Sequence, residues 1–433
     1  MAGDSPGSEL VRVRWALVMA AALTISACAQ SSEPASTAQL TKASGVSFDE
    51  IGIDEVRSAT TVMVRETTGL GANTISGADL SENQVVSPWG AMVALQMLRA
   101  GAGGNTADEL DAVIGSPEAD ATAALIGQLD RFDRNPGDVD QDNPPSPPVF
   151  HQATGVFVDE ALTVDPDYLA ILGRKFDTGV YPVDFAASDT EKAIDNWLAV
   201  NTGGKIAETP TEYNADTVIS LLSTVYLAAA WQQPFAPETT KISDFTAADG
   251  SVGDVNMMRQ TVTAGFLRGA GWRGLQLPYS DGLAMQVFLP EGGSDLAGLL
   301  DERRLTRAST DLRSATQSQV AVGLPRWDVA GTVDLKTVLE RLGVRGLFTE
   351  VADLTAISPD LLVTAAIQDS TITVGEKGTV AASATQVDIG VTAMPPEEQI
   401  ETFIADRPFV YQIIDTSTGL PLILGSINRP GKV

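Results

Sequence analysis

The chain has 433 residues, of which 44% are hydrophobic, and its 28 Lys+Arg against 56 Asp+Glu give a formal net charge of -28. This length allows one large domain or several ordinary ones with a substantial core. The acidic excess repels phosphate backbones, so we exclude nucleic acid as a partner. A single cysteine (Cys28) and a single histidine (His151) exclude intrachain disulfides and Cys/His zinc sites, and argue against a Ser-His-Asp triad. Most familiar hydrolytic machinery is therefore missing, and we expect no metal or cofactor; chemistry by carboxylates alone stays open, although no paired acids stand out at a useful spacing.

The first 46 residues are expected to direct export rather than to fold. Arg12 and Arg14 precede an apolar run, 15–25, that is too short to cross a bilayer comfortably. The run ends in Ile25-Ser26-Ala27-Cys28, which resembles the lipobox of bacterial lipoproteins. This resemblance implies that residues 1–27 are a signal peptide and that Cys28 carries a lipid anchor on the outer face of the bacterial cell membrane. Residues 28–46 have the composition of a flexible tether; the alternative for Cys28 is a buried structural cysteine.

The body of the chain, residues 47–433, contains no second linker and no internal repeat. Its one low-complexity stretch, 135–148, is rich in proline and aspartate, which predicts an exposed loop. Apolar residues at helical spacing predict a helix at 91–100 after the cap pair Ser87-Pro88. A second helix contains Trp197 and ends at Gly203-Gly204, and a third spans 335–342, with Gly343 placed for a left-handed cap.

Apolar runs in the remainder of the body predict β-strands. The predicted strands are 218–228, 285–289, 319–324, 363–373, 409–414 and 420–424. Residues 415–419 separate the last two and predict a hairpin. Since helices dominate the early part of the body and strands the late part, the pattern indicates an α+β fold.

Several short segments, spread from Asp49 to Pro430, resemble segments of the serpin family in the same order. They include Val86-Ser87-Pro88-Trp89, residues 101–110, 194–197 and 201–206, Trp231-Gln232-Gln233-Pro234-Phe235, Asp406-Arg407-Pro408-Phe409 and residues 425–430. The resemblance implies a single α+β domain with three β-sheets, eight or nine helices and an exposed reactive loop. It also implies a monomeric inhibitor of serine proteases that is not itself an enzyme.

The segment 376–385 resembles the hinge of the serpin reactive loop. The matching residues are Glu376, Gly378, Thr379, Ala381, Ala382, Ser383, Ala384 and Thr385. If the chain from Gly378 entered a sheet as a strand, every second residue from Thr379 to Ile389 would face the core, and all of these are small or apolar and uncharged. Gly378 lacks a Cβ, which suits a pivot. No proline occurs between Gly378 and Pro395, so every residue of that stretch could donate a strand hydrogen bond. By itself, an Ala- and Thr-rich stretch of this kind is also typical of an ordinary strand.

The resemblance also locates the bond that a target protease would cleave. In inhibitory serpins this bond usually follows the fourteenth residue after the hinge glycine, which here gives Thr392–Ala393, with the bond after Met394 as second choice. The small, uncharged residues 390–393 suit an elastase-like or subtilisin-like serine protease. The family mechanism implies a covalent complex with the target, formed when the cut loop inserts between the strands at 218–228 and 363–373.

Two single residues and two alternatives complete the predictions. Trp231 resembles a tryptophan at the point where serpin sheets open, although burial alone would also explain it. His151 has no cysteine or second histidine with which to hold a metal, so we expect a structural or surface role. The alternatives are a serpin-fold binding protein without inhibitory action and an unrelated lipoprotein such as a solute-binding protein or an enzyme.

Overall fold

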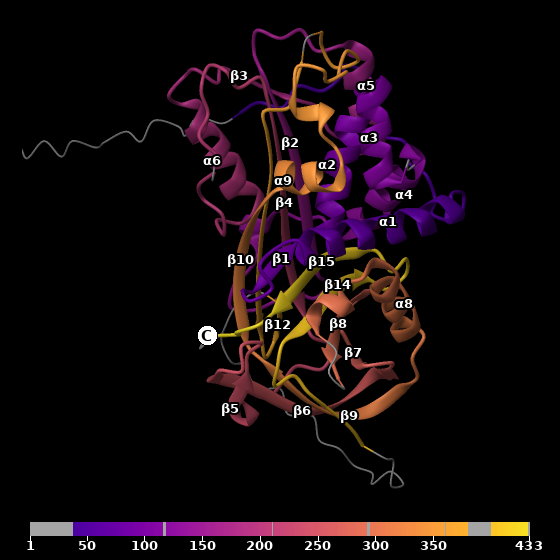
Figure 1. Ribbon diagram of the computed structural model, residues 1–433, viewed down its shortest axis with the longest axis vertical. Helices are drawn as coiled ribbons and strands as arrows, with labels where there is room; N and C mark the ends of the chain where they lie inside the picture. The colour runs from indigo at the N-terminus through magenta and orange to yellow at the C-terminus, as the bar shows by residue number, and fades with distance from the viewer. Residues whose placement is uncertain are drawn as a thin grey trace, which may run out of the picture. The chain divides into compact units, whose positions relative to one another are not determined.

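The computed structural model describes residues 38–115, 118–209, 211–291, 295–359, 361–379 and 400–431 (Figure 1). Residues Ser36–Val433 form one compact unit. The predicted signal peptide and Cys28 lie outside the described residues, and so do residues 380–399. None of the helices in the described part is long and apolar enough to cross a membrane.

The described residues contain nine α-helices, six of them in the first half of the body. They are α1 (Arg57–Ser76), α2 (Pro88–Ala100), α3 (Gly104–Ile114), α4 (Ala119–Leu129), α5 (Pro166–Phe176), α6 (Thr190–Asn201), α7 (Leu296–Leu299), α8 (Glu302–Arg313) and α9 (Leu335–Leu342). Two predicted helix ends are confirmed. The Ser87 hydroxyl accepts a hydrogen bond from the Gly90 N–H at 3.0 Å before α2, and Gly343 after α9 has a φ of +107°.

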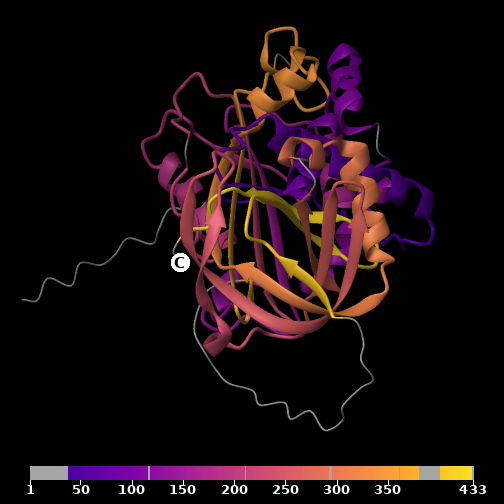
Figure 2. The same ribbon diagram turned by 60° about the horizontal axis from the view of Figure 1, so that its bottom comes forward.

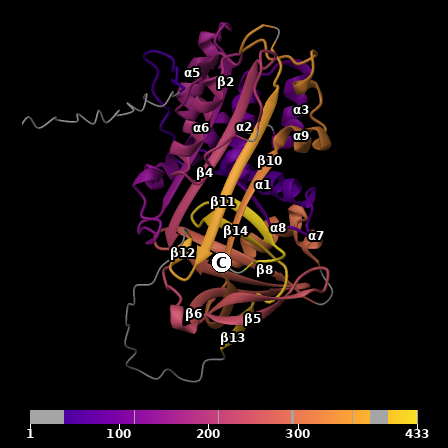
Figure 3. The same ribbon diagram turned by 90° about the vertical axis from the view of Figure 1, so that its left-hand side faces the viewer.

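Six strands form one sheet in the order β10, β11, β12, β4, β2, β3. Their bounds are β10 (Trp327–Asp334), β11 (Ala365–Gly375), β12 (Gly378–Thr379), β4 (Ile219–Ala230), β2 (Val149–Asp159) and β3 (Tyr181–Val183). The predicted strands 218–228 and 363–373 are β4 and β11, confirmed with ends shifted by one or two residues. They lie side by side (Figure 3), because they pair in parallel from Ala365 opposite Ser220 to Ser370 opposite Val225.

The other strands form a second hydrogen-bonded network (Figure 2). They are β1 (Gln84–Val86), β5 (Lys241–Thr246), β6 (Val252–Gly269), β7 (Trp272–Pro278), β8 (Leu283–Pro290), β9 (Gln317–Pro325), β13 (Glu401–Ile404), β14 (Phe409–Asp415) and β15 (Pro421–Ile427). The long strand β6 pairs with β5 at its start, with β9 along its middle and with β7 at its end. It therefore joins the β7–β8–β14–β15–β1 part to the β9–β13 part, and these two parts together with the six-stranded sheet give the three expected sheets.

Helices cover both faces of the six-stranded sheet. Gln368 on β11 points to the start of α2, where its amide donates to the Ser87 carbonyl at 2.8 Å. Alternate residues of a strand point to opposite faces, and Leu222 of β4 packs on the other side with Ile194 and Trp197 of α6. Each such fully buried apolar side chain contributes about 1.5–3 kcal/mol of hydrophobic stabilisation. The middle of the sheet, at β4, is thus buried on both sides, whereas β10 exposes every second residue from Asp328 to Asp334 on one face.

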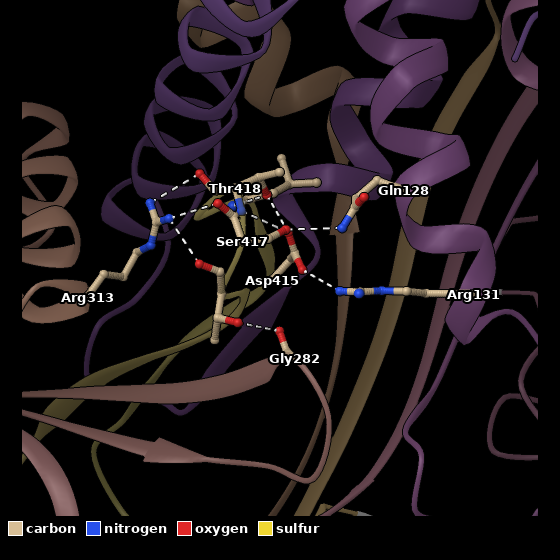
Figure 4. A network of polar contacts seen from close by, with 9 residues as sticks. Gln128, Arg131, Gly282, Arg313, Asp415, Ser417 and Thr418 are labelled. Carbon is tan, nitrogen blue, oxygen red and sulfur yellow. Dashed lines mark hydrogen bonds and ion pairs between the residues drawn. The ribbon is translucent and has the colours of Figure 1, made fainter. Parts of the chain in front are cut away.

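A polar network fixes the hairpin between β14 and β15 (Figure 4). The fully buried Asp415 carboxylate accepts hydrogen bonds from the Ser417 hydroxyl at 2.6 Å, the Thr418 hydroxyl at 2.7 Å and an Arg131 guanidinium N–H at 3.1 Å. From the other side, Arg313 of α8 donates to the main-chain carbonyls of residues 416–418. The predicted hairpin at 415–419 is confirmed, and these contacts tie it to α8 and to the turn that follows α4.

One expectation about a flexible segment needs correction. Residues 38–46, assigned to the tether, contact the folded domain: Thr41 forms a backbone bridge with Val180, and Lys42 pairs with Asp177 at 2.9 Å. The predicted exposed loop at 135–148 is confirmed for most of its residues, although Pro136, Pro144 and Pro148 are buried and a 3-10 helix spans Pro136–Asp138. In the tether, tertiary contacts override a composition that is typical of exposed chain.

His151 of β2 is a structural residue, as expected. Its Nδ1 lies 2.6 Å from an Asp133 carboxylate oxygen, and its Nε2 lies 2.9 Å from the Asn201 Oδ1 at the end of α6. The Asn201 amide nitrogen donates to the Trp197 carbonyl, so its oxygen faces the imidazole. Burial lowers the pKa of His151, but the hydrogen bonds to Asp133 and Asn201 outweigh burial and raise the pKa above its ordinary value. The arrangement favours an imidazolium that ties α6 to β2.

Candidate functional site

The strands β4 and β11 form a fork that holds the start of the predicted hinge. Residues 220–225 and 365–370 pair directly, and we call this part the seam. Beyond the seam, β12 lies between the two strands and runs antiparallel to both. Gly378 and Thr379 pair with Ala230 and Ala229 on one side and with Gly375 and Val374 on the other. The chain direction of β12 is therefore toward the seam (Figure 3).

Gly378 occupies a position that only glycine fits. Its φ is +153°, and a Cβ built on it would lie 2.0 Å from the Ala229 carbonyl oxygen. Real Cβ atoms do not approach a backbone oxygen so closely, so any side chain would push β12 away from β4. The absence of a Cβ is what allows the chain to enter the fork directly after the turn.

Thr379 is bonded to one of two stacked aromatic rings. The residue is only 1% exposed, and its hydroxyl hydrogen-bonds with the Tyr279 hydroxyl. The Tyr279 ring stacks on Trp231 with centroids 4.2 Å apart and planes 7° apart. Burial raises the pKa of Tyr279 far above its ordinary value, against the smaller effect of the hydrogen bond with Thr379, so the phenol stays neutral. The pocket therefore accepts a small, uncharged side chain.

Trp231, directly after β4, binds the turn that leads into β12. Its indole N–H donates to the Gly375 carbonyl at 2.9 Å, and its backbone N–H donates to the Lys377 carbonyl at 2.8 Å. The residue is 4% exposed. Because the ring also stacks on Tyr279, one side chain couples the end of β4 to the end of β11.

The Glu376 carboxylate anchors the other side of the turn. It is buried and forms an ion pair with Arg326, whose Nε donates to it at 2.9 Å, while the Thr240 hydroxyl donates at 2.6 Å. The Glu376 carbonyl accepts from the Phe235 N–H at 2.8 Å. A buried carboxylate of this kind requires its partners, because removing one leaves an uncompensated charge.

The chemistry of this hinge site, which comprises Trp231, Tyr279, Arg326, Glu376, Gly378 and Thr379, is structural. Its phenol is neutral and its carboxylate is paired, so neither is arranged as a nucleophile or general base. In the described part of the chain, no cluster of His, Cys, Asp and Glu side chains could hold a metal ion. What the arrangement can do is receive a strand between β4 and β11.

The structure brings four of the predicted residues together, namely Trp231, Glu376, Gly378 and Thr379. The other predicted loop residues lie outside the described residues: Ala381, Ala382, Ser383, Ala384, Thr385, Thr392, Ala393 and Met394. Sequence reasoning missed Tyr279, Arg326 and Thr240. These come from distant parts of the chain and carry no local pattern, so only the pairing of the strands identifies them.

Comparisons with known proteins agree with this geometry. Residues 72–430 match the family model described as Serpin (serine protease inhibitor). The chain is 30% identical to the leukocyte elastase inhibitor of Bos taurus over 363 residues, which cover 80% of this chain and 93% of that protein. The native-state crystal structure of the thermophilic serpin tengpin matches with a TM-score of 0.76 at 22% identity, covering 91% of this chain and 100% of that one. Serpin48 of Tenebrio molitor matches with a TM-score of 0.72 at 25% identity, covering 87% and 99%. The chain belongs to the serpin family.

Proposed function

We propose that this serpin is an inhibitor that traps serine proteases as a suicide substrate. The observation that carries the proposal is the fork: Gly378 and Thr379 already lie between β4 and β11, with a small uncharged side chain in the buried position. A chain that only bound a ligand would not need the start of a loop inside its central sheet. The family match and the inhibitor named among the relatives support the same conclusion.

In the proposed reaction, the protease serine Oγ attacks the carbonyl carbon of Thr392. The bond to Ala393 breaks, the new amino group leaves with a proton, and an ester joins Thr392 to the protease. Normal turnover would let water hydrolyse this ester. We propose that the freed loop enters the sheet faster than water attacks, and that the attached protease is carried along and distorted. Fourteen residues at ~3.3 Å each would advance the ester roughly 45 Å.

The register of β12 supports a continuous inserted strand. Continued antiparallel from Thr379, residues 380–388 would face 228–220 on β4 and 373–365 on β11. Both neighbours offer partners over this whole length once the seam has parted. Each ladder hydrogen bond gained contributes about 0.5–1.5 kcal/mol net, and the core-facing side chains add apolar burial.

The proposed targets are elastase-like or subtilisin-like enzymes, because residues 390–393 are small and uncharged. The test is incubation with pancreatic elastase, subtilisin and trypsin, followed by denaturing gel electrophoresis. We expect an SDS-resistant complex with elastase or subtilisin, and mass spectrometry of the released peptide should begin at Ala393. Cleavage without any complex would reject inhibition, and a complex with trypsin alone would reject the assigned specificity.

We further propose that the protein is lipid-anchored through Cys28 on the outer face of the cell membrane. The sequence Ile25-Ser26-Ala27-Cys28 after a short apolar run supports this. A Cys28→Ala variant expressed in a bacterium should lose incorporation of labelled palmitate and leave the membrane fraction. If the variant stays in the membrane fraction with unchanged labelling, the anchor is elsewhere.

A further inference from the structure

Four buried polar side-chain atoms in the seam between β4 and β11 have no hydrogen-bond partner among the described residues. They are Oγ of Ser223 and Oγ1 of Thr224 on β4, and Oδ2 of Asp369 and Oγ of Ser370 on β11. These residues are at most 5% exposed and occupy adjacent positions in the register. A buried polar group without a partner disfavours the state that contains it. These unpartnered atoms therefore destabilise the direct pairing of β4 with β11 in the closed seam.

Asp369 is the one of these residues that carries an ionisable group. One of its oxygens accepts from the Thr332 hydroxyl of β10 at 2.6 Å, and the other has no partner in the described part of the chain. Its register partner across the seam is Thr224, whose hydroxyl is also unpartnered. Burial raises the pKa of Asp369, and the Thr332 hydrogen bond opposes this shift.

The surroundings of Asp369 offer it no cation. The side chain lies on the α6 face of the sheet, two residues from Ile367, which packs against the α6 cluster. The titratable groups on that face include Tyr213 and, beyond it, Asp195, and β10 adds the exposed carboxylates of Asp328 and Asp334 on the side of Thr332. Burial chiefly raises the pKa of Tyr213, and the Asp195 and Asp369 carboxylates add to the shift. From β10 only the neutral Thr332 reaches Asp369, and from β4 the facing residue is Thr224. An ionised Asp369 thus has no charge partner among these neighbours.

We propose that Asp369 sets how readily β4 and β11 separate, with the ionised carboxylate favouring the open seam and the protonated acid favouring the closed one. This inference rests on the proposed inhibitory function, for which separation of these strands is the step that admits the loop. Opening lets water reach the carboxylate, and water solvates the charged form far better than the closed seam does. Continued in the register of β12, Ala384 would enter between Asp369 and Thr224.

The sign of the pH effect follows from the raised pKa. The native sheet binds this proton more tightly than the unfolded chain, so the stability contributed by the protonated acid is present at low pH and is lost as the pH rises through the native pKa. Loop insertion should accordingly become faster with rising pH over the same range. Asp369 acts on the strands rather than on the protease, so it is a positioning residue.

The test compares Asp369→Asn with Asp328→Asn between about pH 5 and pH 8. Asp328 is exposed on the neighbouring strand β10 and accepts from Thr373 of β11, so its replacement also removes one charge from the same strand pair. An asparagine at 369 can still accept from Thr332, and its amide can donate toward Thr224. Near pH 8 we expect Asp369→Asn to raise Tm by about 1–4 °C and to slow hydrogen exchange at 220–225 and 365–370 about threefold or more.

The wild-type protein and Asp369→Asn should converge as the pH falls, whereas Asp328→Asn should keep a constant offset. Identical pH profiles for the two variants would overturn the proposal. Should Asp369→Asn not fold, Thr224→Val supplies an independent arm: removing the unpartnered hydroxyl should raise Tm at every pH and leave the wild-type pH dependence of exchange in place. Exchange is compared as protection factors, relative to the base-catalysed intrinsic rate at each pH, and a Thr224→Val protein whose protection factors do not depend on pH would also contradict the proposal.

These readouts need no protease, so they separate this inference from the proposed function. A pH-dependent seam in a protein that never forms an SDS-resistant complex would reject inhibition and leave the role of Asp369 intact. If the wild-type protein forms complexes, Asp369→Asn should consume about threefold more inhibitor per protease trapped near pH 8. An unchanged stoichiometry in that case would reject the role of Asp369 in inhibition.

Discussion

The two ends of the β4–β11 contact differ in how well they are satisfied. At the hinge end, the strands are spread by β12, and Trp231, Tyr279 and Glu376 all have partners with good geometry. At the seam, the strands pair directly, but polar atoms of Thr224 and Asp369 are buried without partners. The comparison indicates that the hinge end is well satisfied and that the closed seam is less well satisfied. Under the proposed mechanism, this difference lets the strands part at one defined place.

The largest expected effect comes from breaking the hinge end. Thr379→Arg would place an unpaired guanidinium in a position that is 1% exposed, at a cost of about 3–5 kcal/mol. The hinge would then be excluded from the fork, and the protease should hydrolyse the ester before insertion. We expect the yield of SDS-resistant complex to fall at least about tenfold, while cleavage at Thr392–Ala393 continues.

The matched control for this variant is Lys377→Arg, which keeps the charge at the adjacent turn, where the Lys377 ammonium donates to the Asp142 carbonyl at 3.2 Å. This control should inhibit like the wild-type protein. A Thr379→Arg protein that still forms complexes at the wild-type level would show that the fork is not the entry point.

A smaller effect is expected at the ion pair that anchors the turn. Glu376→Gln leaves the Arg326 guanidinium without its carboxylate and should lower the free energy of unfolding by about 1–3 kcal/mol. A double-mutant cycle with Arg326→Gln, measured by thermal unfolding, should return a coupling energy of about 1 kcal/mol or more. Glu238→Gln, an exposed change in the nearby 3-10 helix Pro237–Thr239, is the control and should be neutral. Strict additivity of the Glu376 and Arg326 changes would contradict the assigned anchor.

The Tyr279 hydroxyl offers a finer probe of the same end. Tyr279→Phe removes the hydrogen bond to Thr379 and keeps the ring stacked on Trp231. We expect a loss of about 1 kcal/mol and faster hydrogen exchange at the amide of Thr379. Tyr226→Phe, which removes a hydroxyl bonded to Gln141 at 3.1 Å outside the hinge site, should leave that amide unaffected. Equal exchange in the two variants would reject the coupling of Tyr279 to β12.

The smallest effect is expected at His151, which lies on β2 opposite Tyr226 of β4 and belongs to neither the seam nor the hinge site. Because its pKa is raised in the folded protein, its stabilising contribution is complete below the ordinary histidine pKa and is lost as the pH rises through the folded value. His151→Gln should therefore lower Tm more at about pH 5.5 than at about pH 8.5. Asp133→Asn should reduce the same pH dependence, since it removes the carboxylate that favours the imidazolium. A Tm difference that is independent of pH would show that His151 is not protonated in the folded state.

Sequence patterns predicted those helices and turns whose capping and turn residues agree with the tertiary packing around them. Ser87 and Gly343 mark helix ends by their own side-chain and backbone chemistry, and the hairpin at 415–419 follows from its turn residues. The helix α1 carried no such signal, because it contains Gly69 and Gly71, which are poor helix formers. Packing explains Gly71: a Cβ there would lie 2.4 Å from Pro88. The contact with Pro88 therefore requires a glycine at position 71, although glycine lowers the helix propensity of α1.

The candidate site was predictable only in part for a related reason. The alternation of small residues from Thr379 indicates a strand that can enter a sheet, and Gly378 indicates the pivot. The partners that hold the hinge, Tyr279 after β7 and Arg326 between β9 and β10, become neighbours only through the pairing of distant strands. A single tyrosine or arginine in a chain of this length has no pattern that assigns it to a site. Asp369 likewise has no sequence pattern that sets it apart from other polar residues, and only the register places it opposite Thr224.

The central claim is that the uncut protein stores free energy that an inserted strand releases. It is tested most directly by cutting the chain near Thr392 with a metalloprotease, which forms no acyl-enzyme and is therefore not trapped, and comparing the Tm of the cut and intact proteins. The inserted strand would add ladder hydrogen bonds to β4 and β11 along residues 220–228 and 365–373 and bury its core-facing side chains, so the cut protein should melt far higher, by tens of degrees. A cut protein that melts at or below the temperature of the intact one would contradict the account.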